Sequence, residues 1–500
     1  MVVGGGSNNG GAGADTGGSG GGVVQGGSAA GRDATPGGTA GSTGTAGSAG
    51  MAGSGGTETA GAGGAAPRGP GQDYYCDPMA GLPTNPGTAD QPWRRLEEVF
   101  AAGKTFSDGD IIHLRSGNHG SPVVKGGIAA GERRIISDPE QTPVLGTLRF
   151  ADGATHWKVD GVLVSPAEAD GSFTSEPLVQ LDAGAANDVL QNSQVRYAPD
   201  AAAQTWDNAA WVAKSGTAIY VIGKNNQILD NHIRNTRNGV MLERTSVAGA
   251  GATGTLVQGN SVDHFWEDAF RAKVGDCTFE YNSATNSYAV VPSGTEADPP
   301  HRDMLQSYRG DAGLTSIDNV VARGNVFIAR RGERYSKVPF QYNGHYTIQG
   351  LSAFDGPYRG WTIENNVIMV EVGLALYGMD DSTIANNTVV PDPFGADSEI
   401  RLADRKDGTP SKNNVVVNNL VHTLNISAGA NTIASNNLTV ATGAYPSFFL
   451  DYAGYDLHLR PGSAAINAGT MANAPTLDAD RAMRAAPFDA GAFEASGAPP

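Results

Sequence analysis

The segment "WTIENNVI" (residues 361–368) carries the pattern that decides the fold: a short strand rich in β-branched residues, an asparagine at a bend, and the start of a second strand. The segments "STIANNTV" (382–389) and "VVVNNLV" (415–421) repeat it. Several of the repeats are about 20 to 30 residues apart, and intervals near 40 residues indicate a unit that carries a long loop. The asparagines that recur at the bend are Asn192, Asn231, Asn260, Asn282, Asn325, Asn366, Asn387, Asn419 and Asn437.

Each repeat predicts a structural unit that cannot fold alone. A second short strand such as "NGVMLE" (238–243) follows the bend. Asparagine tolerates the left-handed backbone that such a bend needs, and its amide can bond to the asparagines of the units above and below. Since one unit cannot bury its apolar face, the units must stack. We therefore predict an all-β chain in which residues 73–495 form a right-handed parallel β-helix. A β-propeller would need a regular period of about 40 residues and a blade signature, which the sequence lacks.

The two ends of the predicted β-helix differ from its repeats. The stretch "DQPWRRLEEVFAAGK" (90–104) predicts an amphipathic helix. A helix there covers the open first coil, whose unpaired strand edge would otherwise recruit other chains. We assign an N-terminal cap to residues 73–120 and a closing segment to residues 445–495. The apolar face of the capping helix consists of Trp93, Leu96, Val99 and Phe100.

Residues 1–72 consist almost entirely of glycine, alanine, serine and threonine. Such a segment cannot bury enough apolar surface to offset its chain entropy, so we predict a disordered, flexible tether. Its start, "MVVGGG", lacks the charged and apolar regions of a secretory signal. A leader of this composition is nevertheless typical of exported bacterial proteins. We expect an extracellular or surface-anchored protein whose true signal lies upstream; the alternative is a cytoplasmic protein with an unusual tail.

Composition excludes two classes of function. The formal net charge of −17 argues against nucleic-acid binding through phosphate neutralisation. No run of about 20 apolar residues is present, so we predict no membrane span. The two cysteines, Cys76 and Cys277, are expected to be buried as small apolar side chains. We expect a monomer.

Strand alternation predicts which side chains point out of the β-helix. In "EDAFRAKV" (267–274) the residues Phe270, Ala272 and Val274 are expected to point inward. The outward residues are then Ala269, Arg271 and Lys273. In the next coil, "HRDMLQSY" (301–308), Leu305 and Ser307 point inward. The outward residues there are Arg302, Met304, Gln306 and Tyr308.

An alignment of the two coils brings polar groups together. Pairing Asp268 with Asp303 sets Arg271 beside Gln306 and Lys273 beside Tyr308, roughly 5 Å apart across the strands. Two cations, an amide and a phenol on neighbouring strands suit an acidic polysaccharide, which we expect as the partner.

A uronate needs a cation on its carboxylate and a base for its C5 proton. Arg271 is the expected cation, and Lys273 or His301 the expected base. Long loops on such a scaffold often form the binding wall, and aromatic residues there can stack on sugar rings or pack in the loop. The expected substrate-binding residues are Gln306, Tyr308, Arg302, Tyr342 and His345.

Both ends of the chain resemble a known class of proteins. The stretch "DYYCDPMAGLPTNPGTADQPWRRLEEVF" (73–100) resembles the opening of secreted bacterial right-handed β-helix proteins, and "YDLHLRPGSAAINAGT" (455–470) resembles their closing segment. Several of these proteins are polysaccharide lyases. The resemblance implies the fold and a lyase that cleaves an acidic, uronate-containing polysaccharide by β-elimination.

Two lyase families bear on a metal site. "EDAFRAK…FEYNSATN" resembles the D-G-F-x-x-K…Y-N-S-D-D-G pattern of a calcium-dependent pectate lyase family, but Ala284 and Thr285 replace its acidic pair. That calcium site cannot be carried over. The β-helix family of alginate lyases and chondroitinase B uses a lysine base beside a calcium-bound carboxylate cluster, and Lys273 is compatible with this role. Oxygen ligands suit calcium, so we assign Asp268 and Asp303 as candidate Ca²⁺ ligands, or else as turn residues.

Three other functions remain open. A uronate C5-epimerase starts with the same proton removal and differs in the face of reprotonation. A non-catalytic, adhesin-like surface protein could bind glycan through the solenoid face. A glycoside hydrolase needs two carboxylates, and Asp268 with Asp303 is the pair that the sequence offers.

Overall fold

A computed structural model describes residues 71–128, 130–245, 251–288, 290, 292–293, 302–309, 316–331, 348–354, 356–393, 397–427, 429 and 431–495. Within these ranges three long parallel sheets contain 13, 12 and 11 strands. We call them the first, second and third sheets. The predicted tether at residues 1–72 lies almost wholly outside the described residues.

The strands of the first sheet are, in spatial order, β1 (Asp73–Cys76), β2 (Ile111–Leu114), β5 (Arg133–Ser137), β8 (Trp157–Asp160), β11 (Val189–Gln191), β14 (Gln227–Leu229), β17 (Leu256–Gln258), β20 (Thr278–Glu280), β24 (Val321–Arg323), β28 (Thr362–Glu364), β32 (Thr383–Ala385), β35 (Val415–Val417) and β38 (Ile433–Ser435). Those of the second are β3 (Gly117–Asn118), β6 (Pro143–Leu145), β9 (Leu163–Val164), β12 (Gln194–Arg196), β15 (His232–Thr236), β18 (Ser261–Phe265), β21 (Ser283–Ser287), β25 (Val326–Ile328), β29 (Val367–Met369), β33 (Thr388–Val390), β36 (Leu420–Val421) and β39 (Leu438–Thr439).

The strands of the third sheet are β4 (Val123–Val124), β7 (Leu148–Phe150), β10 (Val179–Leu181), β13 (Thr217–Val221), β16 (Asn238–Leu242), β19 (Asp268–Ala272), β22 (Arg302–Tyr308), β26 (Ile348–Phe354), β30 (Val372–Tyr377), β34 (Glu399–Ala403) and β37 (Thr423–Ile426). A small sheet contains β23 (Ile317–Asp318), β27 (Tyr358–Arg359) and β31 (Met379–Asp380).

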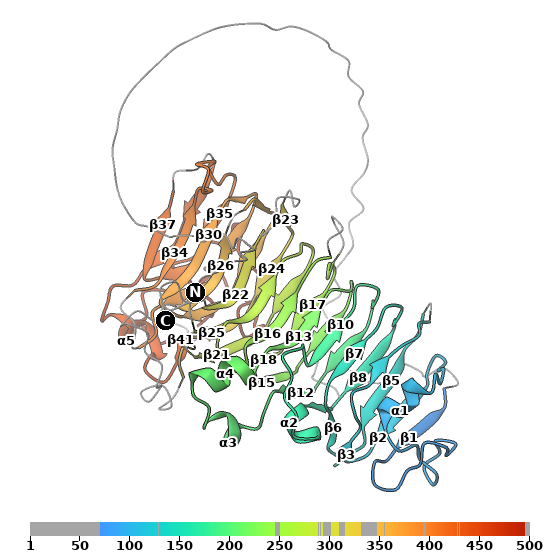
Figure 1. The fold of residues 1–500 in the computed structure, drawn as a ribbon. Coiled ribbons are helices and arrows are strands. Elements are labelled where there is room, and N and C mark those ends of the chain that lie inside the picture. Colours follow the sequence, from blue (N-terminus) through green and yellow to red (C-terminus); the bar gives the residue numbers. More distant parts are fainter. Residues whose placement is uncertain are drawn as a thin grey trace, which may run out of the picture. The chain divides into compact units, whose positions relative to one another are not determined.

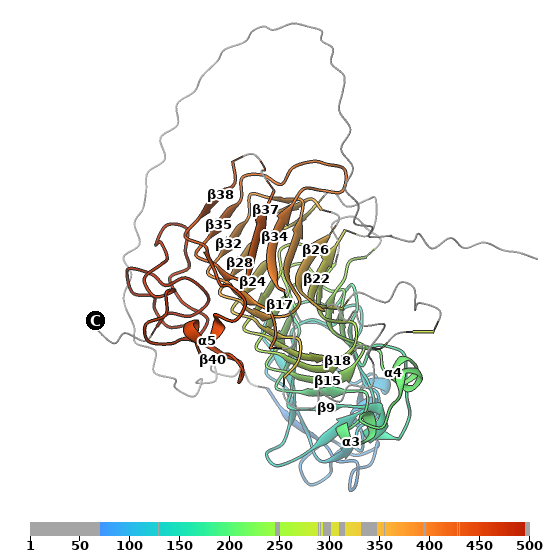
Figure 2. The ribbon, with the colours of Figure 1, turned by 90° about the vertical axis from the view of Figure 1, so that its left-hand side faces the viewer.

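Successive strands visit the three sheets in turn, and each pairs in parallel with the strand one coil later. The chain is therefore a right-handed parallel β-helix, as predicted (Figures 1 and 2). The apolar residues that the alternation assigned to the interior, Phe270, Ala272, Val274 and Leu305, are buried. One continuous core follows from the stacking, because each coil closes the apolar face of its neighbour.

An asparagine ladder connects the coils at the bend after eight neighbouring strands of the first sheet, from β14 to β38. From Asn231 to Asn437 each Nδ2 group donates to the Oδ1 atom of the next asparagine, over 2.8 to 3.1 Å. The ladder confirms the predicted stacking for eight of the nine asparagines. In the coil of Asn192 the ladder position is occupied by Ser193, whose backbone N–H donates to Asn231 Oδ1 over 3.0 Å.

The left-handed bend was assigned one residue too late in eight of the nine coils. The eight ladder asparagines do not have positive φ; the residue before each of them does, as at Asn365 (φ 56°) and Asn386 (φ 54°), whereas Asn192 (φ 50°) is itself the bend residue, as predicted. The bend residue turns the chain, and the next asparagine then points inward to its ladder partners. The two roles that were predicted for one asparagine, turning the chain and bonding to the neighbouring coils, therefore belong to two adjacent residues.

The N-terminal cap contains a shorter helix than predicted. Helix α1 spans Leu96–Ala101, with Leu96, Val99 and Phe100 buried. Trp93 is buried too, but it precedes the helix and forms an isolated bridge with Cys76. Phe100 packs edge-on against Trp157, with ring centroids 5.5 Å apart. Other helices are α2 (Pro166–Ala169), α3 (Asp200–Ala203), α4 (Asn208–Lys214) and α5 (Tyr445–Phe448).

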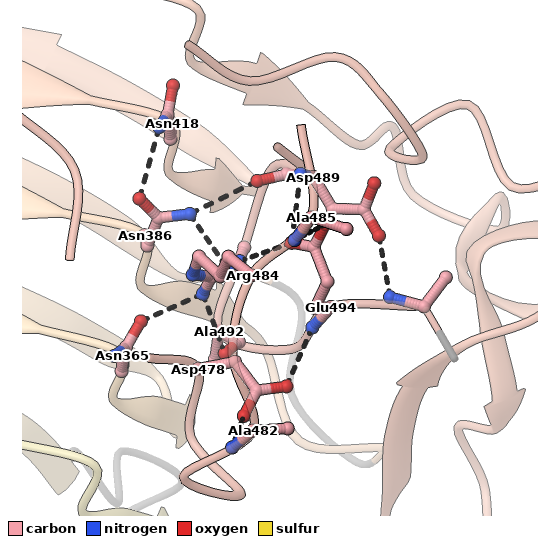
Figure 3. A network of polar contacts seen from close by, with 12 residues as sticks. Asn365, Asn386, Asn418, Asp478, Ala482, Arg484, Ala485, Asp489, Ala492 and Glu494 are labelled. Atoms are coloured by element: carbon pink, nitrogen blue, oxygen red, sulfur yellow. Dashed lines mark hydrogen bonds and ion pairs between the residues drawn. The ribbon is translucent and has the colours of Figure 1, made fainter. Parts of the chain in front are cut away.

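The closing segment contains α5, β40 (Phe449–Asp451) and β41 (Asp456–Leu459), and it then runs along the bend residues. Arg484 joins it to the β-helix: its Nη2 group donates to Asn365 Oδ1 over 2.8 Å, and its Nη1 group pairs with Glu494 Oε2 at 3.0 Å (Figure 3). Asn386 donates to the carbonyls of Asp489 and Gly491. These bonds hold the segment to successive coils.

Cys76 and Cys277 are both free thiols and buried, as expected. Burial raises the pKa of both thiols above the ordinary value. Within the described residues, no helix is long and apolar enough to cross a membrane.

Candidate functional site

The candidate site lies on the outer face of the third sheet, at strands β16, β19 and β22. Asp268 pairs with Asp303 and Arg271 pairs with Gln306 across β19 and β22, which is the register that the sequence predicted. Arg271 also pairs with Met241 in β16. We call the residues at this register position on successive strands the Arg271 row: Tyr220, Met241, Arg271, Gln306, Ser352, Ala375 and Arg401.

Two buried aspartates lie at the start of the two strands, and each has a partner three residues later. Asp268 Oδ2 accepts from Arg271 Nε over 3.0 Å and from its Nη2 group as well. Asp303 Oδ2 accepts from Gln306 Nε2 over 2.8 Å, and Asp303 Oδ1 accepts from Ser352 Oγ over 2.5 Å. Neither aspartate is exposed to solvent. The pair is therefore more than a turn element, because its carboxylates anchor outward-facing polar side chains.

Burial has the largest influence on the pKa values of Asp268 and of its partner Arg271. Burial raises the pKa of Asp268 well above its usual range; the guanidinium of Arg271 opposes this shift, and the carboxylate of Asp303 adds to it. Burial also acts to lower the pKa of Arg271, but the Asp268 carboxylate outweighs it, so that the pKa of Arg271 is raised. Arg271 is thus always positively charged, and the buried carboxylate of Asp268 compensates part of that charge.

Glu243, one coil before Arg271, is a site residue that the sequence analysis missed. Its Oε1 atom lies 3.5 Å from Arg271 Nη1, and its Oε2 atom lies 3.4 Å from Lys273 Nζ. One buried carboxylate therefore bridges both cations. An alignment of "NGVMLE" with "DAFRAK" would have found it, because Glu243 then occupies the position of Lys273.

Tyr308 lies beside the two cations, as the alignment predicted. Lys273 Nζ lies 4.3 Å from the centre of the Tyr308 ring, and the guanidinium carbon of Arg271 lies 5.7 Å from it. Such cation–π contacts favour a cation over the ring face. Arg271 and Lys273 keep 15% and 18% of their side chains exposed, so both remain within reach of a ligand on the outer face.

Three residues that were expected to point outward are buried. Ala269 and Met304 belong to the apolar core. The guanidinium of Arg302 donates to the carbonyls of Tyr288, over 3.1 Å, and Val290, over 2.9 Å. All three lie within the first three residues of their strands, and the two-residue alternation does not hold there. The substrate-binding role of Arg302 stays a prediction, with its guanidinium already bound to backbone.

Three predicted site residues, His301, Tyr342 and His345, lie outside the described residues. An insertion with helices α3 and α4 precedes β13 (Figure 1). Its Trp206 and Trp211 are buried, with ring centroids 5.1 Å apart, and Trp211 packs on Tyr288. These two tryptophans therefore pack against each other and, through Trp211, against the segment that follows β21.

The donors available for calcium are few in the described part of the site. Asp268 Oδ1 and Gln306 Oε1 are buried and have no hydrogen-bond partner there. The remaining carboxylate oxygens of Asp268 and Asp303 already accept from Arg271, Gln306 and Ser352. The described ranges contain no group of three or more His, Cys, Asp or Glu residues that could hold a metal ion. Since Ca²⁺ takes six to eight oxygen ligands, these residues alone do not fit it, and the calcium assignment stays a prediction that needs further oxygen donors.

The fold defines the class of right-handed parallel β-helix proteins. No family description matches the chain, and no curated protein matches it. Solved structures with a similar chain path include pectate lyase Pel9A, which is 14% identical with a TM-score of 0.42 over 85% of this chain and 96% of the other. A rhamnogalacturonan lyase is 15% identical with a TM-score of 0.42, over 76% and 91% of the two chains. A PL6-family polysaccharide lyase from Pseudopedobacter saltans is 14% identical with a TM-score of 0.46, over 74% and 96%.

Proposed function

We propose that this chain is an extracellular polysaccharide lyase that cleaves a uronate-containing polymer by β-elimination on the outer face of the third sheet. The observation that carries the proposal is the position of the two cations: Arg271 lies on β19, Lys273 directly follows that strand, and both lie beside the ring of Tyr308 on β22. The extracellular location is part of the proposal and is supported by the glycine-rich leader.

Arg271 neutralises the uronate carboxylate in this proposal. Removal of the C5 proton places negative charge on the carboxylate, and a fixed guanidinium next to it lowers the free energy of that state. Asp268 holds the guanidinium from below through two N–H groups, so Arg271 needs little reorganisation when the substrate arrives. The substrate carboxylate competes with Glu243 for the outer edge of the guanidinium.

Lys273 removes the C5 proton in its neutral amine form. The C5–H electron pair then forms the C4–C5 double bond while the C4–O bond breaks, and the leaving oxygen takes a proton from Tyr308 Oη. The Nζ atom of Lys273 lies 3.4 Å from Glu243 Oε2 and 4.3 Å from the centre of the Tyr308 ring. His301 is the alternative base of the proposal. Each proton transfer of this type contributes a factor of about 10² to 10⁴ to the rate.

A second candidate is glycan binding without cleavage. Glu243 favours it, because its carboxylate forms ion pairs with both cations, and an ion-paired lysine is suited to binding rather than to proton removal. The same face then holds an acidic glycan and leaves it intact.

The test is incubation of the purified chain with alginate, pectate and glycosaminoglycan polymers, followed by the ultraviolet absorbance of the C4–C5 double bond. The lyase proposal predicts rising absorbance with at least one polymer. Binding without new absorbance supports the second candidate. Exchange of solvent deuterium into the polymer without chain cleavage identifies a C5-epimerase instead.

A further inference from the structure

A second row of side chains runs beside the Arg271 row on the outer face of the third sheet. Lys273 is followed by Tyr308, which pairs with Phe354 on β26. Phe354 lies next to Tyr377 on β30, with ring centroids 5.1 Å apart. All three aromatic side chains are half-buried, so part of each ring is open to solvent. We call Tyr308, Phe354 and Tyr377 the aromatic row.

Beside these rings, the residues of the Arg271 row have short side chains. After Gln306 it continues with Ser352 on β26 and Ala375 on β30, both buried. At these two positions the row carries short side chains, and neither is exposed to solvent. A sugar ring is therefore held by the exposed parts of the three aromatic side chains, edgewise or face-on, and not by the sheet at Ser352 and Ala375.

The row ends in another cation. Arg401 on β34 pairs with Ala375, and its Nη1 group donates to Tyr377 Oη over 3.0 Å. Its side chain is 41% exposed, although its Nη2 group also contacts Glu399. From Arg271 to Arg401 there are four strand-to-strand steps, or about 19 Å at the usual spacing of parallel strands. The strands concerned follow one another in Figure 1.

We propose that Arg401 is a distal carboxylate-binding subsite and that the aromatic row connects it to Arg271. The ligand is an acidic oligosaccharide several units long, laid across strands β19 to β34 with its axis along the β-helix. Cations at both ends and aromatic rings between them match a chain that carries carboxylates on sugar rings. A single acidic sugar is too short to reach both cations. This inference rests on the proposed preference for acidic polysaccharides but does not require cleavage.

Binding of oligosaccharides of increasing length tests the proposal. Acidic oligouronates of two to eight units are titrated calorimetrically into the full chain, with neutral oligosaccharides of the same lengths in parallel. For the wild-type chain we expect the affinity to rise with length until the ligand spans both cations, and then to level off. Arg401→Met should weaken the long oligomers about fivefold, as expected for a partly exposed charge pair, and leave dimers unchanged.

Tyr377 gives a second, graded measurement. Tyr377→Ala removes the ring and should weaken long oligomers by a factor of about 2 to 10, whereas Tyr377→Phe keeps the ring and should retain most of that affinity. Arg359→Met is the matched control, since Arg359 is exposed on β27 in a different sheet. Thermal unfolding of every variant shows whether it is folded.

The outcomes separate this subsite from the proposed chemistry. Length-dependent binding lost in Arg401→Met, with no cleavage by the wild type, leaves the subsite standing and removes the lyase. Cleavage by the wild type with unchanged length dependence in Arg401→Met overturns the subsite and keeps the lyase. Equal affinity for neutral and acidic oligomers also overturns the subsite, because Arg271 and Arg401 would then contribute nothing to the binding of the ligand's carboxylates.

Discussion

Lys273 Nζ lies 4.3 Å from the centre of the Tyr308 ring, one coil further along the β-helix. The two side chains are 35 residues apart in the sequence and meet because parallel strands place equivalent positions of successive coils side by side. The contact puts a candidate base and a candidate acid on one surface, with Arg271 next to both.

Lys273→Met should abolish β-elimination, because the variant keeps the apolar stem but cannot accept the C5 proton. We expect the rate to fall by about 10² to 10⁴, measured as ultraviolet absorbance of unsaturated products. Lys158→Met is the control, since Lys158 lies on β8 in the first sheet. A Lys273→Met variant with wild-type activity would exclude this lysine and direct attention to His301.

Glu243→Gln should increase the activity at a fixed neutral pH if Lys273 is the base. The substitution removes the ion pair between Glu243 and Nζ, 3.4 Å apart, so that the amine is no longer held by a carboxylate and is available for the C5 proton. It also frees the outer edge of Arg271 for the substrate carboxylate. The measurement is the initial rate at several pH values, and a several-fold increase is expected.

Two results would contradict that interpretation. A Glu243→Gln variant that loses activity while its unfolding temperature is unchanged would show that the carboxylate itself takes part in the reaction. Tighter glycan binding without any cleavage would support the binding protein instead. Glu280→Gln is a suitable control, because Glu280 lies on β20 in the first sheet and pairs there with Arg323.

The sequence was sufficient to predict which site residues pair between neighbouring coils, but not which of them are buried. The repeat fixes which coil follows which, so the pairing of Asp268 with Asp303 could be read from spacing. Alternation holds from residue 270 onward in β19 and fails near the strand start, so the burial of Ala269 was not foreseen. Such corners depend on contacts between segments that are far apart in the chain.

The bridging carboxylate could have been predicted, whereas the burial of Arg302 could not. Glu243 occupies the same position in its coil as Lys273 does, and aligning three coils instead of two would have placed it beside both cations. Arg302 is held by the carbonyls of Tyr288 and Val290, which lie between β21 and β22 and outside the sequence repeat. Periodic positions are therefore predictable here, and positions that depend on irregular turns are not.

His119 makes the N-terminal cap sensitive to acid. It is buried, its Nε2 atom lies 2.7 Å from the carbonyl of Arg115, and burial lowers the pKa of His119 from 6.5 to about 4. In the unfolded chain the imidazole takes up a proton below pH 6.5, whereas in the folded chain it does so only near pH 4. This stabilising contribution is therefore present above pH 6.5 and is lost as the pH falls toward 4, by about 3 kcal/mol in all.

His119→Gln should reduce that loss, because glutamine does not titrate. The measurement is the free energy of unfolding in denaturant at a series of pH values, compared between the variant and the wild type. Buried Asp188, whose pKa burial raises to about 7, contributes a slope of opposite sign, but it is common to both chains and cancels in the difference. Identical slopes for the two chains would show that His119 is solvated or already charged in the fold.

Asn325→Ala should destabilise the middle of the β-helix more than Asn437→Ala destabilises its end. Asn325 Oδ1 accepts from both the backbone N–H and the Nδ2 group of Asn282, and its own Nδ2 group donates to Asn366 Oδ1 and to the carbonyl of Phe279. Alanine leaves these buried groups without partners, at a cost of about 3 kcal/mol. Asn437 is half-buried at the end of the ladder, so water can replace its bonds and the cost should be about 1 kcal/mol. Denaturant unfolding of the two variants measures the difference, and equal losses would mean that the ladder contributes no more in the interior than at the edge.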